Sequence, residues 1–271
     1  MMIAHYLKTA FRSLSKYKQQ ILISVIGMSV GFVCFALSTV WNRYELSFDN
    51  FHSASDRIYL VTLSSEKEEK GFIPQTPYPL ATHLKDVFPE VEQACRVGFI
   101  DGQTLHLAEG RDVTVMSMPA DTNFFHVFDV SFNERTSSLL NSDESIILNE
   151  TFASEVNPGT VVRAGDMLGG NTDDAKKYMV EAVVKPWPGN TNFLFDVMVP
   201  IQKDEDWSIS RYMSVSTYIK VAEGTDMDSF VRKIQAYKVP SNPDISLQVM
   251  PLKDVYHSAV TWNYKVKHEY I

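Results

Sequence analysis

The chain has 271 residues, of which 45% are hydrophobic and 12% aromatic, and this composition excludes a disordered protein because such a chain can bury a sizeable core. Its 25 Lys and Arg against 33 Asp and Glu give a formal net charge of −8. General nucleic-acid binding is therefore not expected, since an acidic chain repels phosphate.

The charge is distributed unevenly along the chain. Residues 1–20 carry no acidic side chain and four basic ones: Lys8, Arg12, Lys16 and Lys18. Apolar residues recur at helical spacing between them, so 1–20 is predicted to form a cationic amphipathic helix on the inner face of the membrane. A plain topology signal explains the charges equally well, but it does not explain the apolar stripe.

Residues 21–42 are predicted to form a transmembrane helix. The 24 residues between Lys18 and Arg43 are all uncharged, which is enough to cross a hydrocarbon core of about 30 Å. The preceding basic residues predict a cytoplasmic N-terminus, a single pass through the inner (plasma) membrane and an extracytoplasmic remainder. A cleaved signal peptide is the alternative, although the apolar run exceeds the usual length of about 7–15 residues.

The predicted span carries two further features. Gly27 and Gly31 lie four residues apart on one helix face, where small residues let another helix approach closely, although glycine is common in membrane helices generally. Trp41 and Tyr44 are predicted to anchor the outer end of the span at the membrane interface, as the basic residues of 1–20 do at the inner end.

The remainder predicts an α+β domain. Strands at 57–63, 94–100 and 112–118 with a helix at 79–87 form one set, and strands at 216–221 and 245–250 with a helix at 227–237 form a second. Together these sets predict a split, ferredoxin-like β-α-β layer, here called porter-like. Strands at 145–148 and 177–185 with a helix at 150–156 predict an inserted subdomain. The predicted parts are 43–119 and 201–256 for the porter-like halves, 120–200 for the insertion and 257–271 for a return toward the membrane.

Motifs for catalysis are missing from the sequence. It contains no glycine-rich phosphate loop and no zinc-ligand spacing. We therefore predict no catalytic residue, no metal, no cofactor and no enzyme activity. The acidic clusters at 173–174 and 204–206 are more typical of solvated loops than of a calcium site, and Trp187 and Trp207 are expected to be packing residues.

The segment directly after the span is more specific. Residues 45–52 read E-L-S-F-D-N-F-H, and residues 56–59 read D-R-I-Y. Its aromatic side chains are expected at the membrane interface or packed under the outer domain. Asp49 and Asp56 are expected to cap or pair locally, with Arg57 as a candidate partner.

This segment resembles the start of the extracytoplasmic domain in ABC transporter permeases of the MacB/FtsX type. The resemblance covers nearly the whole chain, and its specificity lies in the combination of motifs. The further motifs are L-x-x-A-F-R-S-L at 7–14, I-G-M-x-x-G at 26–31, D-x-x-F-F-x-V-F at 121–128, S-I-I-L-N-E-T-F-A at 145–153, V-x-A-V-V at 180–184, N-F-x-F-D at 192–196 and P-L-K-D-V-Y at 251–256.

The resemblance implies a dimeric permease that works with a separate cytoplasmic ABC ATPase. ATP hydrolysis inside would drive movement of the outer domain (mechanotransmission) for export, lipoprotein release or other periplasmic work, with a periplasmic or outer-membrane protein as a further partner. Such permeases have three more spans after the outer domain, so this sequence is expected to be the N-terminal part of one. The alternative is a single-span sensor or scaffold whose outer domain binds a ligand or a protein.

Overall fold

The computed structural model describes residues 5–6, 12, 16–65, 73–107, 111–157, 159–169, 176–201, 215–239 and 245–258. The chain divides into two compact units, Met1–Ser47 and Phe48–Ile271, which are described separately.

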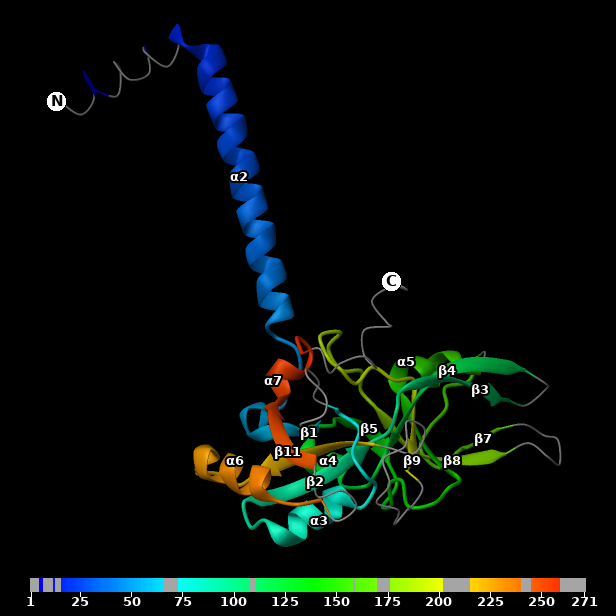
Figure 1. Cartoon of the computed structure of the whole chain (residues 1–271). Helices are drawn as coiled ribbons and strands as arrows, with labels where there is room; N and C mark the ends of the chain where they lie inside the picture. Colours follow the sequence, from blue (N-terminus) through cyan, green and yellow to red (C-terminus); the bar gives the residue numbers. More distant parts are fainter. Residues whose placement is uncertain are drawn as a thin grey trace. The chain divides into compact units, whose positions relative to one another are not determined.

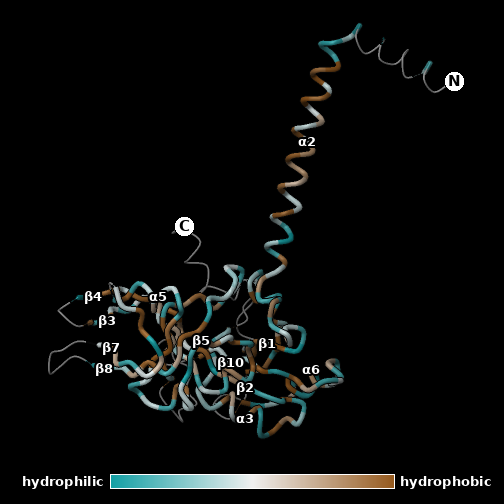
Figure 2. Tube along the Cα trace, turned by 180° about the vertical axis from the view of Figure 1, so that it is seen from behind, coloured by the Kyte–Doolittle hydropathy of each residue, from teal (hydrophilic) through white to brown (hydrophobic). Residues whose placement is uncertain are grey.

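The first unit is dominated by one long apolar helix, α2 (Lys18–Glu45). Its most apolar window has a mean hydropathy of 2.3, and none of its residues is buried; the apolar colouring follows most of its length (Figure 2). The hydroxyl groups of Ser29 and Thr39 each donate to the carbonyl four residues earlier at 2.8 Å, which satisfies them in apolar surroundings. Length and composition thus make α2 the candidate membrane span. Most of the amphipathic helix predicted at 1–20, including Lys8, lies outside the described residues.

The second unit is built on one mixed sheet flanked by short helices (Figure 1). Its helices are the 3₁₀ turn η1 (Ser55–Arg57), α3 (Leu80–Val87), α4 (Phe124–Val127), α5 (Glu150–Glu155), α6 (Met227–Ala236) and α7 (Leu252–Val255). Its strands are β1 (Ile58–Ser65), β2 (Val91–Val97), β3 (Asp101–His106), β4 (Asp112–Ala120), β5 (Phe132–Arg135), β6 (Ser145–Asn149), β7 (Met167–Gly169), β8 (Lys177–Val184), β9 (Val197–Pro200), β10 (Ser216–Val221) and β11 (Ile245–Pro251).

Four strands form the split β-α-β layer that the sequence predicts. They lie in the order β11-β1-β10-β2, and every neighbouring pair is antiparallel. The helices α3 and α6 supply Leu80, Leu84, Phe230 and Ile234 to a buried cluster with side chains of these strands. Asp226 caps α6 by accepting from the backbone N–H groups of residues 228 and 229 at 3.1 and 3.3 Å. This strand order is that of a ferredoxin-like layer.

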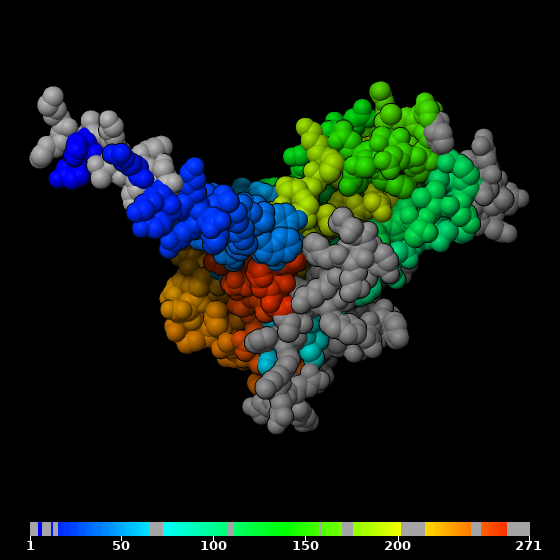
Figure 3. Space-filling model, turned by 90° about the horizontal axis from the view of Figure 1, so that it is seen from above, coloured from blue at the N-terminus to red at the C-terminus, as the bar shows by residue number. Residues whose placement is uncertain are grey.

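The sheet continues into a second half in the order β4-β9-β6-β8-β5, with β3 paired to β4 and β7 to β8. The two halves are joined by a single residue pair between β2 and β4, Val97 and Ala120. Next to this joint the backbones approach closely, because a Cβ added to Gly98 would lie 2.7 Å from Cβ of Pro119. The second half has its own buried cluster around Ile146, Leu148 and other side chains. In the space-filling view, α6 and α7 (orange to red) and the second half (green) occupy separate parts of the surface (Figure 3).

The predicted elements and the observed ones agree in type but not everywhere in extent. The strand predicted at 94–100 runs from 91 to 97. The strands β3, β5, β7 and β9 were not predicted, because they are short or polar. The limits of the insertion at 120 and 200 remain a prediction, and both acidic clusters (173–174 and 204–206) and Trp207 lie outside the described residues.

Candidate functional site

The first segment of the second unit lies beside the last segment that the structure describes. Residues 48–57, called here the exit segment, follow α2 in the chain, and residues 251–258 form the return segment. The ring of Phe48, which is 2% exposed, stacks on the ring of Tyr256 with centroids 3.5 Å apart and an interplanar angle of 13°. Directly beyond, β1 pairs with β11, so that Tyr59 lies opposite Pro251. The exit segment and the return segment are therefore in direct contact.

The exit segment is also clamped to a distant loop through Asp49. This residue has a left-handed backbone, φ 54°, and its N–H donates to the carbonyl of Asn190 at 3.0 Å. Its carboxylate accepts from the hydroxyl of Thr191, from the backbone N–H of Asn192 at 3.2 Å and from Nδ2 of Asn192 at 2.6 Å. The partners belong to residues 186–193, called here the proline loop. The prediction that Asp49 pairs locally was wrong, since its partners lie about 140 residues away.

The surroundings of Asp49 are unfavourable for a charge. The residue is fully buried, and burial raises the pKa of its carboxyl to about 6, although the hydrogen bonds from Thr191 and Asn192 act in the opposite direction. The carboxylate is therefore held ionised at neutral pH by the donors of the proline loop. Among the described atoms, Oδ1 of Asn192 is buried and accepts no hydrogen bond. An unpaired acceptor therefore lies on the same side chain that donates to Asp49.

A second buried polar residue, His52, lies three positions further along the exit segment. Its Nδ1 accepts from the backbone N–H of Asp129 at 3.2 Å, and its Nε2 is buried without a described partner. Burial lowers the pKa of His52 to about 4, against the opposing charge of Asp129, so the ring is neutral at physiological pH. Asp129 further accepts from the backbone N–H of Ser53 and, at its own carbonyl, from Nε1 of Trp187 at 3.1 Å. Asp129 thus links the exit segment to the proline loop.

An aromatic cluster surrounds these polar contacts. His52 lies 4.2 Å from the ring of Phe51 and 5.2 Å from those of Phe128 and Trp187, measured between centroids. The expectation that Trp187 is a packing residue is confirmed. The cluster extends through Phe124, Phe193, Phe195 and Tyr218. We call the clamp, the aromatic cluster and the Phe48–Tyr256 stack together the junction.

The remaining motif residues hold the backbone around the junction. Asp196 exchanges two contacts with Met116, because its carboxylate accepts the N–H of Met116 at 2.7 Å and its own N–H donates to the Met116 carbonyl at 2.9 Å. Asp121 accepts from the backbone N–H and from Nε of Arg96 at 3.0 and 3.1 Å, and burial raises its pKa against these contacts. Both aspartates therefore connect strands of the sheet.

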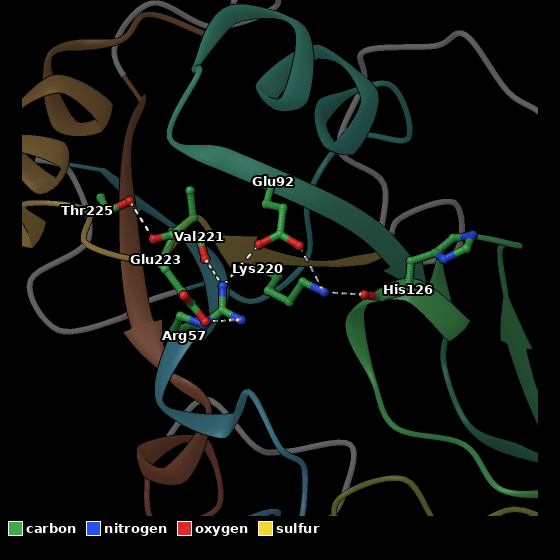
Figure 4. A network of polar contacts seen from close by, with 8 residues as sticks. Arg57, Glu92, His126, Lys220, Val221, Glu223 and Thr225 are labelled. Carbon is green, nitrogen blue, oxygen red and sulfur yellow. Dashed lines mark hydrogen bonds and ion pairs between the residues drawn. The ribbon is translucent and has the colours of Figure 1, made fainter.

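A charged network lies at the other end of the exit segment (Figure 4). Nη1 of Arg57 donates to Glu92 at 3.0 Å and to the carbonyl of Val221 at 2.9 Å. Lys220 contacts Glu92 at 3.3 Å and donates to the carbonyl of His126 at 2.7 Å. Arg57 thus pairs across the sheet, and no contact with Asp56, the expected local partner, occurs in the described part of the chain.

The anchors predicted on the first unit lie where the sequence places them, and their role stays a prediction. Trp41 and Tyr44 are neighbours on α2, with ring centroids 6.3 Å apart and exposed fractions of 66% and 40%. A Cβ added to Gly27 or Gly31 would meet nothing within 4 Å, so the glycine face is open. Arg12, Lys16 and Lys18 are helical and precede the apolar run.

The junction consists of polar and aromatic contacts between chain segments that lie far apart in the sequence. Over the described ranges, no group of three or more His, Cys, Asp or Glu is placed to hold a metal ion. Its polar atoms bind backbone groups and one another, and its rings fill the space between three chain segments. In the described part of the chain, one apolar helix long enough to cross a membrane precedes a split β-α-β layer with a second α+β half, so the class is that of a candidate membrane anchor joined to an α+β domain.

The comparisons with known proteins agree with this class. The family model of the MacB-like periplasmic core domain matches residues 21–237. The chain therefore belongs to this family of ABC transporter permease domains. No curated protein matches the chain.

Two solved structures with TM-scores above 0.5 share the fold at low sequence identity, and a third is similar at a lower score. A domain of a permease protein from Porphyromonas gingivalis has a TM-score of 0.62 and 18% identity, covering 74% of this chain and 92% of that chain. The periplasmic region of MacB from Actinobacillus actinomycetemcomitans has a TM-score of 0.51 and 10% identity, covering 75% and 92%. The extracellular domain of the noncanonic ABC-type transporter YknZ from Gram-positive bacteria has a TM-score of 0.49 and 13% identity, covering 71% and 99%.

Proposed function

We propose that this chain is the membrane-anchored outer part of an ABC transporter permease that transmits movement outward from the membrane. One observation carries the proposal: the exit and return segments stack through Phe48 and Tyr256 and are clamped by Asp49 to the proline loop. A shift of the chain at either end of the domain is thereby passed to the joint between the two halves of the sheet. A separate cytoplasmic ATPase supplies the energy in this proposal, and the chain itself is not an enzyme.

We further propose an orientation of the chain in the membrane and the proteins with which it works. The N-terminus lies in the cytoplasm and the outer domain in the periplasm or its equivalent, because Arg12, Lys16 and Lys18 precede the span and acidic residues dominate after it. A second permease subunit packs against the face marked by Gly27 and Gly31. A periplasmic or outer-membrane protein receives the movement, in export, lipoprotein release or related work.

Purification from the native host tests the proposed ATPase. The protein with an N-terminal tag is extracted from membranes in a mild detergent, and the copurifying proteins are identified by mass spectrometry. We expect an ABC ATPase to be enriched over a tagged single-span protein of similar abundance. Recovery of a signalling protein in place of an ATPase would contradict the proposal and favour the sensor or scaffold alternative.

The glycine face is tested by substitution. The double variant Gly27→Leu/Gly31→Leu is expected to reduce recovery of the second permease subunit, because leucine side chains keep the helices apart. Ala36→Leu is the matched control, since residue 36 lies half a turn away from residue 27 at about 100° per residue. Equal recovery with both changes would remove the glycine face from the account.

A further inference from the structure

A surface cavity of the outer domain lies between the end of the exit segment and the loop after β10. Its volume is about 450 Å³, and polar side chains line it: Ser53, Asp56, Arg57, Tyr59, Glu223 and Thr225. Cavities of roughly 300–1,000 Å³ are the usual size for small ligands. The junction does not use this cavity, although the D-R-I-Y motif contributes three of its residues.

Arg57 presents unused hydrogen-bond donors to this cavity. Its Nη1 is fixed by Glu92 and by the carbonyl of Val221, which orients the guanidinium plane. Its Nη2 lies 3.7 Å from Glu223, too far for a hydrogen bond. Nε and Nη2 therefore have no hydrogen-bond acceptor among the described residues, on a side chain that is only 25% exposed. A planar carboxylate matches such a pair of donors.

The carboxylate of Glu223 lies nearest to Nη2 of Arg57, and it is held only by a weak ion pair. The Glu223 side chain is 87% exposed, and it follows strand β10 beside Gly224, whose left-handed backbone has φ +76°. In Figure 4 the Glu223 carboxylate occupies the open side of the guanidinium. It stands where the carboxylate of a ligand would lie, and an exposed ion pair of this kind contributes little.

The charge of the cavity restricts the ligand further. Asp56 and Glu223 both line the cavity, and the Asp56 carboxylate has no hydrogen bond or ion pair in the described part of the chain. A simple anion would be repelled by these two carboxylates. A ligand that also carries an ammonium group would be attracted by them and would place its carboxylate on Arg57. A simple cation would leave the open donors of Arg57 without an acceptor, so the cavity favours a zwitterion over either single charge.

We propose that this cavity binds the zwitterionic head of an amino-acid-sized ligand, with its carboxylate on Arg57 and its ammonium group on Asp56 and Glu223. Glu223 leaves Arg57 as the ligand arrives and then pairs with the ammonium group. The binding site requires no ATPase and no transport cycle, so it stands independently of the proposed function.

Three small molecules test the charge requirement on the full chain in detergent micelles. Binding of alanine, acetate and ethylamine is measured by saturation-transfer NMR at equal ionic strength. We expect alanine to bind saturably with a dissociation constant below about 10 mM, and we expect the dissociation constants of acetate and of ethylamine to be at least about tenfold higher. Equal affinity for alanine and acetate, or no saturation by alanine, would overturn the proposal.

Variants assign the contacts. Arg57→Gln is expected to abolish alanine binding, and its thermal unfolding is recorded because Arg57 also holds Glu92. Asp56→Asn/Glu223→Gln changes only exposed side chains, and it is expected to weaken alanine about tenfold while strengthening acetate. Asp228→Asn, an exposed acid on α6 outside the cavity, is the control and should bind alanine like the wild type. Unchanged alanine binding in the Asp56/Glu223 double variant would refute the assignment.

Discussion

Replacement of Asp49 by asparagine tests the electrostatic strain of the clamp. The folded-state pKa of Asp49 is raised from 3.8 to about 6 by burial. Because the folded-state pKa is raised, Asp49 leaves the folded state most stable below pH 3.8, where its carboxyl is protonated in both the folded and the unfolded state. This stability is lost as the pH rises from 3.8 through 6, because ionisation is less favourable in the folded protein. At pH 7 the cost of ionising Asp49 in the folded protein is about 3 kcal/mol, from about 1.4 kcal/mol per pKa unit.

The asparagine that replaces Asp49 is neutral at every pH and does not incur this cost. We expect the unfolding free energy of Asp49→Asn, relative to that of the wild type, to rise by about 2 kcal/mol between pH 4 and pH 7, because part of the cost is already present at pH 4. The titration of His52 occurs in both proteins and cancels in the difference. The absolute difference also depends on hydrogen bonds, since the new amide donor can reach Oδ1 of Asn192 only if the Asn192 amide turns over.

The assay is urea unfolding of the full chain in a nonionic detergent, followed by tryptophan fluorescence at pH 4, 5, 6 and 7. Asp86→Asn, the same substitution at an exposed site on α3, is the matched control for the change of side chain. A constant difference between Asp49→Asn and the wild type across the four pH values would refute the claim that Asp49 is a strained buried carboxylate.

Three further changes test other contacts of the junction and the pairing of β2 with β4 that joins the two halves of the sheet. The pKa of His52 is lowered to about 4, so the stability that its neutral ring contributes is present above pH 6.5 and is lost as the pH falls through 4. In the same assay, the unfolding free energy of His52→Asn should therefore fall by about 3 kcal/mol less than that of the wild type between pH 7 and pH 4. Equal losses of unfolding free energy would contradict this. Phe48→Ala, Tyr256→Ala and the double variant should give a coupling energy of about 1 kcal/mol in a double-mutant cycle, and additive effects would show that the stack contributes nothing. Gly98→Ala should cost about 1–3 kcal/mol because its Cβ would meet Pro119 at 2.7 Å, whereas Gly102→Ala, whose Cβ would make only an ordinary contact with Thr114 at 3.8 Å, should cost less.

The elements of the porter-like layer were predictable because their residues carry a clear period. The strand that begins at Ile58 is rich in β-branched and aromatic residues, and α6 repeats apolar residues at helical spacing. By contrast, β3 reads D-G-Q-T-L-H and forms a strand only because β4 lies beside it. β9 has four residues and ends at a proline, which leaves too short a window for any periodicity.

The partners within the junction were not predictable from local pattern. Asp49 and Asn192 both belong to recognisable motifs, but their contact joins positions 143 residues apart. The left-handed φ of Asp49 agrees with the tolerance of aspartate for that conformation. The sequence offers one signal for a buried contact, which is the position of Asp49 between Phe48 and Phe51. A carboxylate that is buried among aromatic residues needs hydrogen-bond donors.

The most direct test of the proposed transmission is the distance between the two outer domains of the native complex, measured with and without ATP. A fluorescence donor and acceptor are attached at the exposed position of Asp86, through Asp86→Cys in a background in which Cys34 and Cys95 are replaced. We expect ATP to change the energy transfer, and we expect Asp49→Ala/Asn192→Ala to remove this change while ATP hydrolysis continues. Energy transfer in the wild-type complex that does not respond to ATP would contradict the account.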